Sequence, residues 1–179
     1  MIDTKTNYLR YSAAHSTVII NNTNISELIE KKSYKRIPTI ITSVKEENEN
    51  FEIWESQHDG YQKNYNKIIK RRIKISKNKS EVIGLDTILN TRIDNKQIFY
   101  QIRFHLMPNI ISLLTNNQKS VLLKTKNNNT WIFKTESKIT LEDSIYIGDG
   151  NKIEQNKQIV ISGLINQKNI AESWSITKS

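Results

Sequence analysis

Several residue types are scarce or missing in the 179-residue sequence. It contains no cysteine, which excludes a disulfide framework, a thiolate zinc finger and a cysteine nucleophile. Its five glycines form neither a phosphate-binding loop nor a dinucleotide-binding motif. No run approaches the ~18 apolar residues of a membrane span, and residues 1–10 are too polar for a signal peptide. We therefore expect a soluble protein with no membrane partner.

Positive charge is in excess. The sequence has 27 Lys and Arg residues against 18 Asp and Glu residues, a net charge of +9. Such a balance suits polyanions in general, although the over-use of Lys, Ile and Asn, whose codons are A/T-rich, indicates that codon drift contributes part of it. The most basic run, residues 67–74, is not accompanied by clustered aromatic residues for base stacking. We therefore expect no nucleic-acid partner.

The hydrophobic pattern is that of β-strands. In residues 101–106, Ile102 and Phe104 alternate with Arg103 and His105, so the apolar and polar side chains lie on opposite faces. Asn- and Asp-rich turn signals separate such segments at near-regular spacing. The other candidate strands are 16–20, 39–44, 51–55, 69–75, 120–125, 131–134, 144–147, 158–162 and 173–177.

This pattern predicts an all-β fold, an antiparallel β-sandwich of stacked sheets in a single domain over residues 1–179. One short helical turn is predicted at residues 24–30, where Asn24 would cap the turn and Glu27 would return the bond. Core packing is expected for the three tryptophans, which lie in strand candidates, whereas an exposed tryptophan would indicate sugar stacking. They are Trp54, Trp131 and Trp174.

The three histidines, His15, His58 and His105, lie about 45 residues apart. No local metal-binding motif therefore exists, and the histidines could meet only through the tertiary fold. An isolated histidine is more often a hydrogen-bonded structural residue than a ligand or a base. Their sequence contexts are more informative than their number.

These contexts belong to a collinear series of short segments. The series comprises residues 10–18 (RYSAAHSTV), 22–28 (NTNISEL), 58–61 (HDGY), 102–106 (IRFHL) with Pro108, 141–148 (LEDSIYIG), 158–163 (QIVISG) and 174–176 (WSI). Together they resemble the C-terminal region of the heparinase II/III-like polysaccharide lyases, over nearly the whole chain. The resemblance looks strongest to bacterial members of the family.

The resemblance implies a β-sandwich that follows an N-terminal helical toroid, with the substrate cleft between the two. Enzymes of this family cleave uronic-acid-containing polysaccharides by β-elimination, in which a base removes the proton next to the uronate carboxylate. Much of this machinery belongs to the helical part, which lies outside these residues, so the catalytic residues are unknown. The implied partners are an acidic polysaccharide and a helical toroid domain, and the isolated chain is expected to be inactive. Family members are often periplasmic or secreted, but the sequence itself predicts no compartment.

A metal site is also implied by the resemblance. His15 matches a family position that is commonly a zinc ligand, and neutral imidazole suits zinc. The remaining ligands of the family precede this segment, apart from an acidic position near Asp3 whose surroundings do not match. His15 is thus the one candidate ligand for a possible zinc ion.

Four residues are implied contacts for the substrate. His58 and Tyr61 are expected on a loop, where they could face the cleft and contact sugar hydroxyls, although Asp59 could simply order the turn. Arg103 and His105 share the polar face of one strand, and Arg pairs with carboxylates bidentately. The alternative for Arg103 is a pair with a carboxylate inside the sandwich.

Two functions remain open on these grounds. The first is the C-terminal domain of a polysaccharide lyase, forming one wall of the cleft. The alternative is a non-catalytic β-sandwich that binds an anionic glycan or a protein partner.

Overall fold

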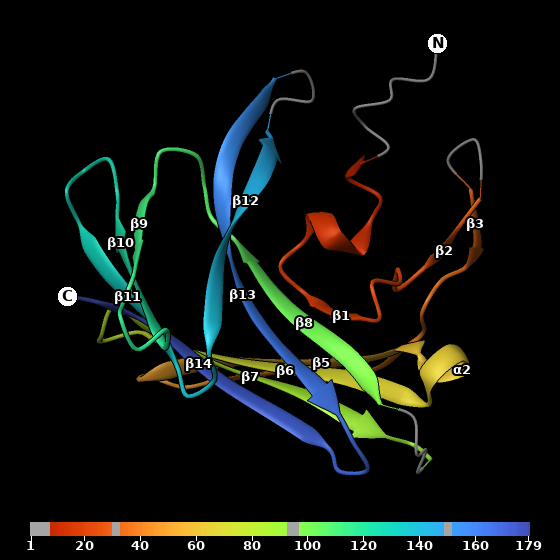
Figure 1. The fold of residues 1–179 in the computed structure, drawn as a ribbon. Coiled ribbons are helices and arrows are strands. Elements are labelled where there is room, and N and C mark those ends of the chain that lie inside the picture. The colour runs from red at the N-terminus through yellow and green to blue at the C-terminus, as the bar shows by residue number, and fades with distance from the viewer. Residues whose placement is uncertain (1–7, 30–32, 93–96, 149–151) are drawn as a thin grey trace.

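The protein is a sandwich of two antiparallel β-sheets in a computed structural model that describes residues 8–29, 33–92, 97–148 and 152–179 (Figure 1). The smaller sheet has the strand order β1-β8-β13-β12. Its strands are β1 (Val18–Ile20), β8 (Ile98–His105), β12 (Ile139–Ile147) and β13 (Ile153–Ile165). The predicted all-β sandwich is therefore confirmed.

The larger sheet has eight strands in the order β4-β5-β6-β7-β14-β11-β10-β9. Four strands precede the smaller sheet's β8 in the sequence: β4 (Ile40–Glu47), β5 (Phe51–Tyr61), β6 (Lys67–Ser76) and β7 (Glu81–Asn90). The others are β9 (Ile111–Leu114), β10 (Ser120–Lys124), β11 (Thr130–Thr135) and β14 (Ile170–Lys178). Short elements complete the fold: η1 (Ser12–Ala14), the hairpin β2 (Glu27–Leu28) and β3 (Tyr34–Arg36), and α2 (Gln62–Tyr65).

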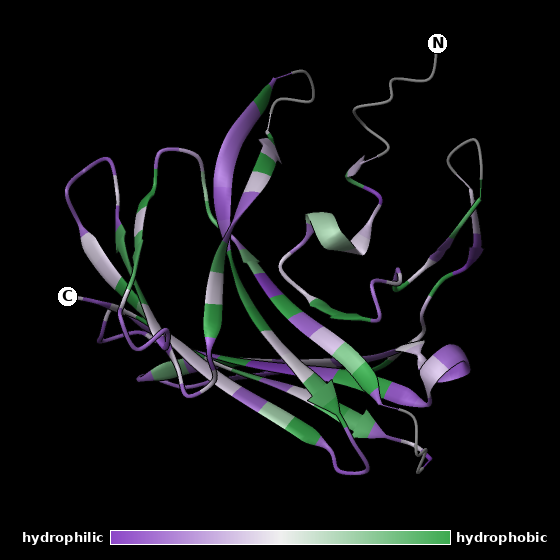
Figure 2. Ribbon diagram, in the orientation of Figure 1, coloured by the Kyte–Doolittle hydropathy of each residue, from purple (hydrophilic) through white to green (hydrophobic). Residues whose placement is uncertain are grey.

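The hydrophobic core lies between the two sheets. Along β8 the buried side chains alternate with partly exposed ones, and Figure 2 shows this alternation as green and purple bands. The centre of the core is aromatic, because the ring of Phe104 lies 4.9 Å from the rings of both Phe133 and Trp174. Burial of these three large side chains fixes the smaller sheet over the middle of the larger one.

An ion pair between neighbouring strands of the larger sheet, Arg71 on β6 and Asp86 on β7, lies at this core. Asp86 is fully buried on β7, and it accepts bonds from Arg71 Nε (2.6 Å) and Nη2 (2.9 Å) and from Trp174 Nε1 (2.9 Å). Arg71 also donates from Nη1 to the carbonyl of Ser16 at 2.6 Å. The larger sheet thereby holds the chain segment that enters the smaller one.

That segment, residues 8–29, lies beside β8 at the edge of the smaller sheet (Figure 1). Ser12 anchors it, since its backbone N–H donates to Asn24 Oδ1 (2.9 Å) and its hydroxyl accepts from the Ile25 N–H (2.8 Å). The backbone N–H of Arg103 donates to the carbonyl of Thr17 at 3.1 Å. The segment therefore reaches the polar face of β8.

Several details differ from the sequence predictions. The helical turn predicted at residues 24–30 is wrong: Glu27–Leu28 is strand β2, because Asn24 bonds back to Ser12 instead of capping a helix. The loop predicted for His58 and Tyr61 is wrong too, since β5 continues through Tyr61 with an irregular register between the two residues.

The tryptophans follow the expectation only in part. Trp174 is buried in the core as predicted, whereas Trp54 on β5 is 46% exposed, so its predicted core packing is wrong. Trp54 donates from Nε1 to Glu52 (2.7 Å), and the Lys45 ammonium lies 5.0 Å from its ring centroid. Its outer position on the sheet, beyond the aromatic centre, explains the exposure.

Candidate functional site

The polar face of β8 carries the centre of the candidate site. Gln101, Arg103 and His105 are partly exposed on this face, while Ile102 and Phe104 between them are buried in the core. This arrangement confirms the alternation predicted from the sequence. The side chains of one strand face therefore stand in a row on the outer surface of the smaller sheet.

Arg103 is held by two amides. Its Nη2 donates to Gln101 Oε1 at 2.7 Å, and its Nη1 donates to Gln158 Oε1 at 3.1 Å. Its Nε is buried and has no hydrogen-bond partner among the described residues. In the described part of the chain no carboxylate forms an ion pair with Arg103, contrary to the alternative of an internal Arg–carboxylate pair. Among the described residues, the guanidinium therefore has no acidic partner.

His105 uses both ring nitrogens. Nε2 lies 3.0 Å from the carbonyl of Ala13, which can only accept, so this nitrogen carries the proton. Nδ1 lies 2.9 Å from Ser144 Oγ and accepts from it in the neutral ring. Burial lowers the pKa of His105 most, the positive charges of Arg103 and His15 lower it further, and the bond to Ala13 opposes the shift.

Residues 8–29 bring His15 near His105, because the backbone carbonyl of Ala13, two residues before His15, accepts from Nε2 of His105. His15 is exposed, and its Nε2 lies 2.7 Å from the carbonyl of Leu9. Arg103 and His105 therefore share one strand face, and His15, the third of the five predicted site residues, lies in the segment that contacts His105. All three are basic groups.

A zinc site is not completed here. No group of three or more His, Asp or Glu side chains in the described part of the chain is placed to hold a metal ion. Asp3, the acidic residue nearest to the implied second ligand position, lies outside the described residues. The side chains present around His15 do not fit a zinc ion by themselves, and we assign no chemistry to one.

His58 and Tyr61 lie elsewhere. Tyr61 is only 1% exposed, its hydroxyl donates to the carbonyls of Val18 (3.2 Å) and Thr23 (3.1 Å), and burial raises its pKa. Nδ1 of His58 accepts from the Gly60 N–H at 3.2 Å. These contacts tie Tyr61 to the segment around β1, whereas His58 bonds within its own strand.

The turn-ordering role considered for Asp59 is not what the structure has, because Asp59 lies within β5 and bonds to a residue before β4. Its Oδ1 accepts from the backbone N–H of Thr39 at 2.6 Å. The pKa of neighbouring His58 is lowered by burial, and the negative charge of Asp59 opposes that shift. Asp59 thus ties β5 to Thr39, the residue before β4.

Sequence reasoning missed three residues of the site. Gln101 and Gln158 hold Arg103, and Ser144 positions the ring of His105. Gln101 stands two residues before Arg103 on the same strand face, so its proximity could have been read from the alternation. Gln158 and Ser144 belong to other strands, and only the pairing of β8 with β13 and of β13 with β12 brings them close.

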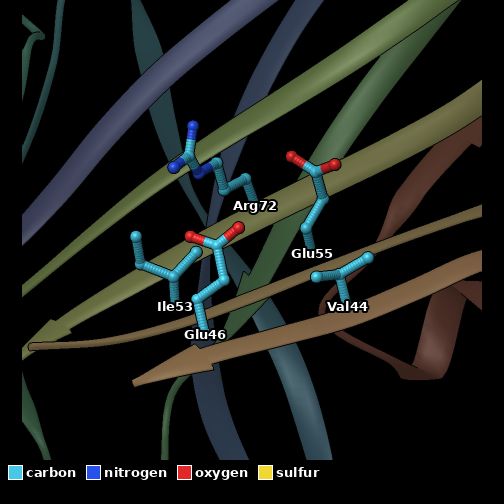
Figure 3. A pocket seen from close by; sticks show the side chains of 5 residues that line it. All are labelled: Val44, Glu46, Ile53, Glu55 and Arg72. Atoms are coloured by element: carbon cyan, nitrogen blue, oxygen red, sulfur yellow. The ribbon is translucent and has the colours of Figure 1, made fainter. Parts of the chain in front are cut away.

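A separate hollow opens on the outer face of the larger sheet (Figure 3). Val44, Glu46, Ile53, Glu55 and Arg72 line it. Glu55 accepts from Lys70 Nζ at 2.7 Å, so one of the two carboxylates that line the hollow is already paired. Its mixed charges favour neither an anion nor a cation, and it carries none of the predicted site residues.

No helix in the described part of the chain has both the length and the apolar character needed to cross a membrane. The family model described as "Heparinase II/III-like, C-terminal" matches residues 3–175. No curated protein is matched by sequence.

Solved structures share the fold at low sequence identity. The heparan sulfate lyase HepC from Pedobacter heparinus is 14% identical with a TM-score of 0.71, and the match covers 96% of this chain and 25% of that one. A heparinase III gene product is 12% identical with a TM-score of 0.73, covering 97% and 25%. Another heparinase III structure is 17% identical with a TM-score of 0.64, covering 92% and 23%. This chain spans about a quarter of their length.

Proposed function

Because this chain belongs to the heparinase II/III-like, C-terminal family, we propose that it is the C-terminal domain of a polysaccharide lyase that cleaves uronic-acid-containing polysaccharides by β-elimination. The polar face of β8 would form one wall of the substrate cleft, and a helical toroid domain would form the other. One observation carries the proposal: the unpaired charge of Arg103, beside His105 and His15, suits an acidic sugar.

The chemistry of β-elimination explains why such a charge is useful. When the proton next to the uronate carboxylate is removed, negative charge spreads onto that carboxylate, and a fixed cation lowers the barrier. Each terminal nitrogen of Arg103 gives one N–H to a glutamine and retains a second N–H. These remaining donors can bind a carboxylate. The base and the acid that move the protons would belong to the helical domain.

His105 would position a neighbouring side chain and would not transfer a proton. Both of its ring nitrogens are occupied, by Ala13 and Ser144, so the ring is a fixed support for the hydroxyl of Ser144. That hydroxyl stands where β12 and β13 meet the polar face of β8, within reach of a sugar. The proposal does not extend to Tyr61, whose buried hydroxyl already has two backbone partners.

The proposal is tested by a lyase assay with the helical half supplied, either in one polypeptide or as a second chain. The unsaturated uronate product is followed by absorbance with heparan sulfate, chondroitin sulfate and alginate as substrates. We expect product from at least one of them, and a large loss of activity in the Arg103→Ala variant. Absence of product from all three substrates contradicts the proposal.

A binding role without catalysis is the alternative, and the same observation favours it. The basic face formed by His15, Arg103 and His105 lies entirely within this chain, so it needs no helical domain to attract a polyanion. The isolated chain would then bind heparan sulfate in a salt-sensitive manner, while the chain combined with a helical half would yield no product. Indifference of the chain to polyanions excludes this alternative.

A further inference from the structure

The surroundings of Arg103 point to a role for two glutamines. We infer that Gln101 and Gln158 are positioning residues, which hold the guanidinium of Arg103 while leaving its charge unbalanced, so that the site selects an anionic group. The inference rests on the proposed function, in which Arg103 contacts an acidic sugar. It adds which side chains make that contact possible.

The two glutamines approach Arg103 from different strands. Gln101 lies two residues earlier on β8, and Gln158 lies on β13 directly opposite His105. Their Oε1 atoms accept from Nη2 at 2.7 Å and from Nη1 at 3.1 Å. These two hydrogen bonds restrict the rotamers of the arginine side chain before any ligand arrives, which lowers the entropic cost of binding.

The acceptors are amide oxygens and not nitrogens. A guanidinium has only donors, so each glutamine must present its oxygen to Arg103. For Gln158 a second contact agrees, because its Nε2 faces the carbonyl of Asp143 at 3.4 Å. Gln158 is only 5% exposed, so its amide is held within the sheet and cannot readily turn to solvent.

The chain itself provides a comparison. Arg71 is held by the carboxylate of Asp86 through two bonds of 2.6 and 2.9 Å, and this carboxylate balances its charge. Arg103 donates the same number of bonds to neutral side chains. A partly buried arginine with a purely structural role is better served by a carboxylate, because an unbalanced charge is costly away from water. Neutral acceptors at Arg103 are what a site for an external anion requires.

The neighbouring charges reinforce this reading. His105 and His15 add no negative charge, and neither of the two acidic residues on β12 bonds to Arg103. Glu142 accepts from the Thr140 hydroxyl at 3.0 Å, and Asp143 pairs with Lys157 at 2.6 Å.

The test replaces one amide with a carboxylate of the same shape. Gln158→Glu would balance the charge of Arg103 with an internal partner, and we expect the chain to bind a heparan sulfate hexasaccharide at least about tenfold more weakly. Gln158→Met removes the bond between Gln158 and Arg103 but leaves the charge of Arg103 unbalanced, so a smaller loss of affinity is expected. Gln155→Glu makes the same change of net charge at an exposed position of β13 and should bind like the wild type. Isothermal titration calorimetry at two salt concentrations measures all four proteins.

The outcomes separate the inference from the proposed function. If the wild type binds and Gln158→Glu binds as tightly as Gln155→Glu, the inference is overturned whatever the lyase assay gives. If the wild type does not bind the hexasaccharide, the inference is overturned as well. If the affinities follow the expected order but no substrate is cleaved with the helical half present, the inference stands and the lyase function fails. Thermal unfolding of each variant checks that the fold is retained.

Discussion

Asp86 shows how a single side chain supports both sheets. Its carboxylate accepts from Arg71 and from Trp174, and Arg71 passes a further bond to the carbonyl of Ser16 in the segment before β1. Asp86 is fully buried and the Arg71 side chain is only 21% exposed, so water can replace little of this ion pair. Loss of the negative charge leaves the Arg71 guanidinium without a counter-ion, held by its bond to the carbonyl of Ser16.

We therefore expect Asp86→Asn to lower the free energy of unfolding by about 3–5 kcal/mol, the usual cost of breaking a buried ion pair from one side. Urea denaturation followed by tryptophan fluorescence measures the change. Asp143→Asn serves as the control, since the Asp143 side chain is 91% exposed in its pair with Lys157 and should contribute no more than about 1 kcal/mol. Equal effects of the two substitutions contradict the expectation.

His58 makes stability depend on pH. Burial lowers its pKa below the ordinary value of 6.5, and Nδ1 accepts a bond from the Gly60 N–H that protonation would abolish. The unfolded chain therefore takes up a proton at a higher pH than the folded one. Stability is highest above about pH 6.5 and falls as the pH drops through the window below it.

The variant His58→Gln removes this contribution. Its unfolding free energy should change less between pH 7.5 and pH 5.5 than that of the wild type, in a denaturation series at each pH. The slope that remains includes His105, whose pKa is also lowered by burial and by Arg103 and His15. An unchanged slope in His58→Gln shows that His58 does not titrate differently in the two states.

Among the elements, β7 and β14 approach each other closely at one point. A Cβ atom added at Gly84 would lie 2.0 Å from Cζ2 of Trp174, on the neighbouring strand, so the absence of a side chain at Gly84 provides the space for the indole. That indole is stacked on Phe133 and meets Phe104 edge-on in the aromatic centre. The glycine is needed for space rather than for an unusual backbone angle.

Gly84→Ala is expected to destabilise the protein by about 1–3 kcal/mol or more, because the buried ring has nowhere to move. Gly148→Ala is a matched control: its added Cβ would meet Tyr146, a partly exposed side chain that can rotate away. Thermal unfolding of both variants gives the comparison. A larger loss at Gly148 than at Gly84 contradicts this account.

Strand β9 forms an open edge of the larger sheet and pairs only with β10. Ile111 and Leu113 on this edge are 69% and 63% exposed, and Leu122 beside Leu113 is exposed as well. Apolar edge strands with free backbone groups promote association between molecules.

We expect Leu113→Lys to reduce self-association of the chain at high concentration, as measured by analytical ultracentrifugation, without lowering its stability by more than about 0.5 kcal/mol. Unchanged association shows that this edge is not the contact.

For the whole molecule, the alternation of single strands carried most of the sequence prediction. It placed Arg103 and His105 on one face because both belong to one regular strand. It missed β7, since the inward positions of that strand include Gly84 and Asp86, which are not apolar although they face the core. The folded structure explains both residues, because Trp174 fills the space at Gly84 and Arg71 pairs with Asp86.

The rest of the site depends on contacts between distant segments. His15 reaches the polar face through the path of residues 8–29, and Gln158 reaches Arg103 through the pairing of β13 with β8. Tyr61 was expected at a surface because its sequence neighbours near Asp59 are polar. Its side chain is instead buried, and its hydroxyl bonds to Val18 of β1. Tertiary packing decided each of these positions, and a single sequence does not contain that information in a local pattern.

The strand order also has a consequence for synthesis of the chain. β14 lies in the middle of the larger sheet, between β7 and β11, yet it is made some eighty residues after β7. Without residues 170–178, β7 and β11 would each be an unpaired edge, and β4–β7 would not be joined to β9–β11. Released chains that end before residue 170 should therefore be cut readily by protease, and chains that include residues 170–178 should be protected in both halves together.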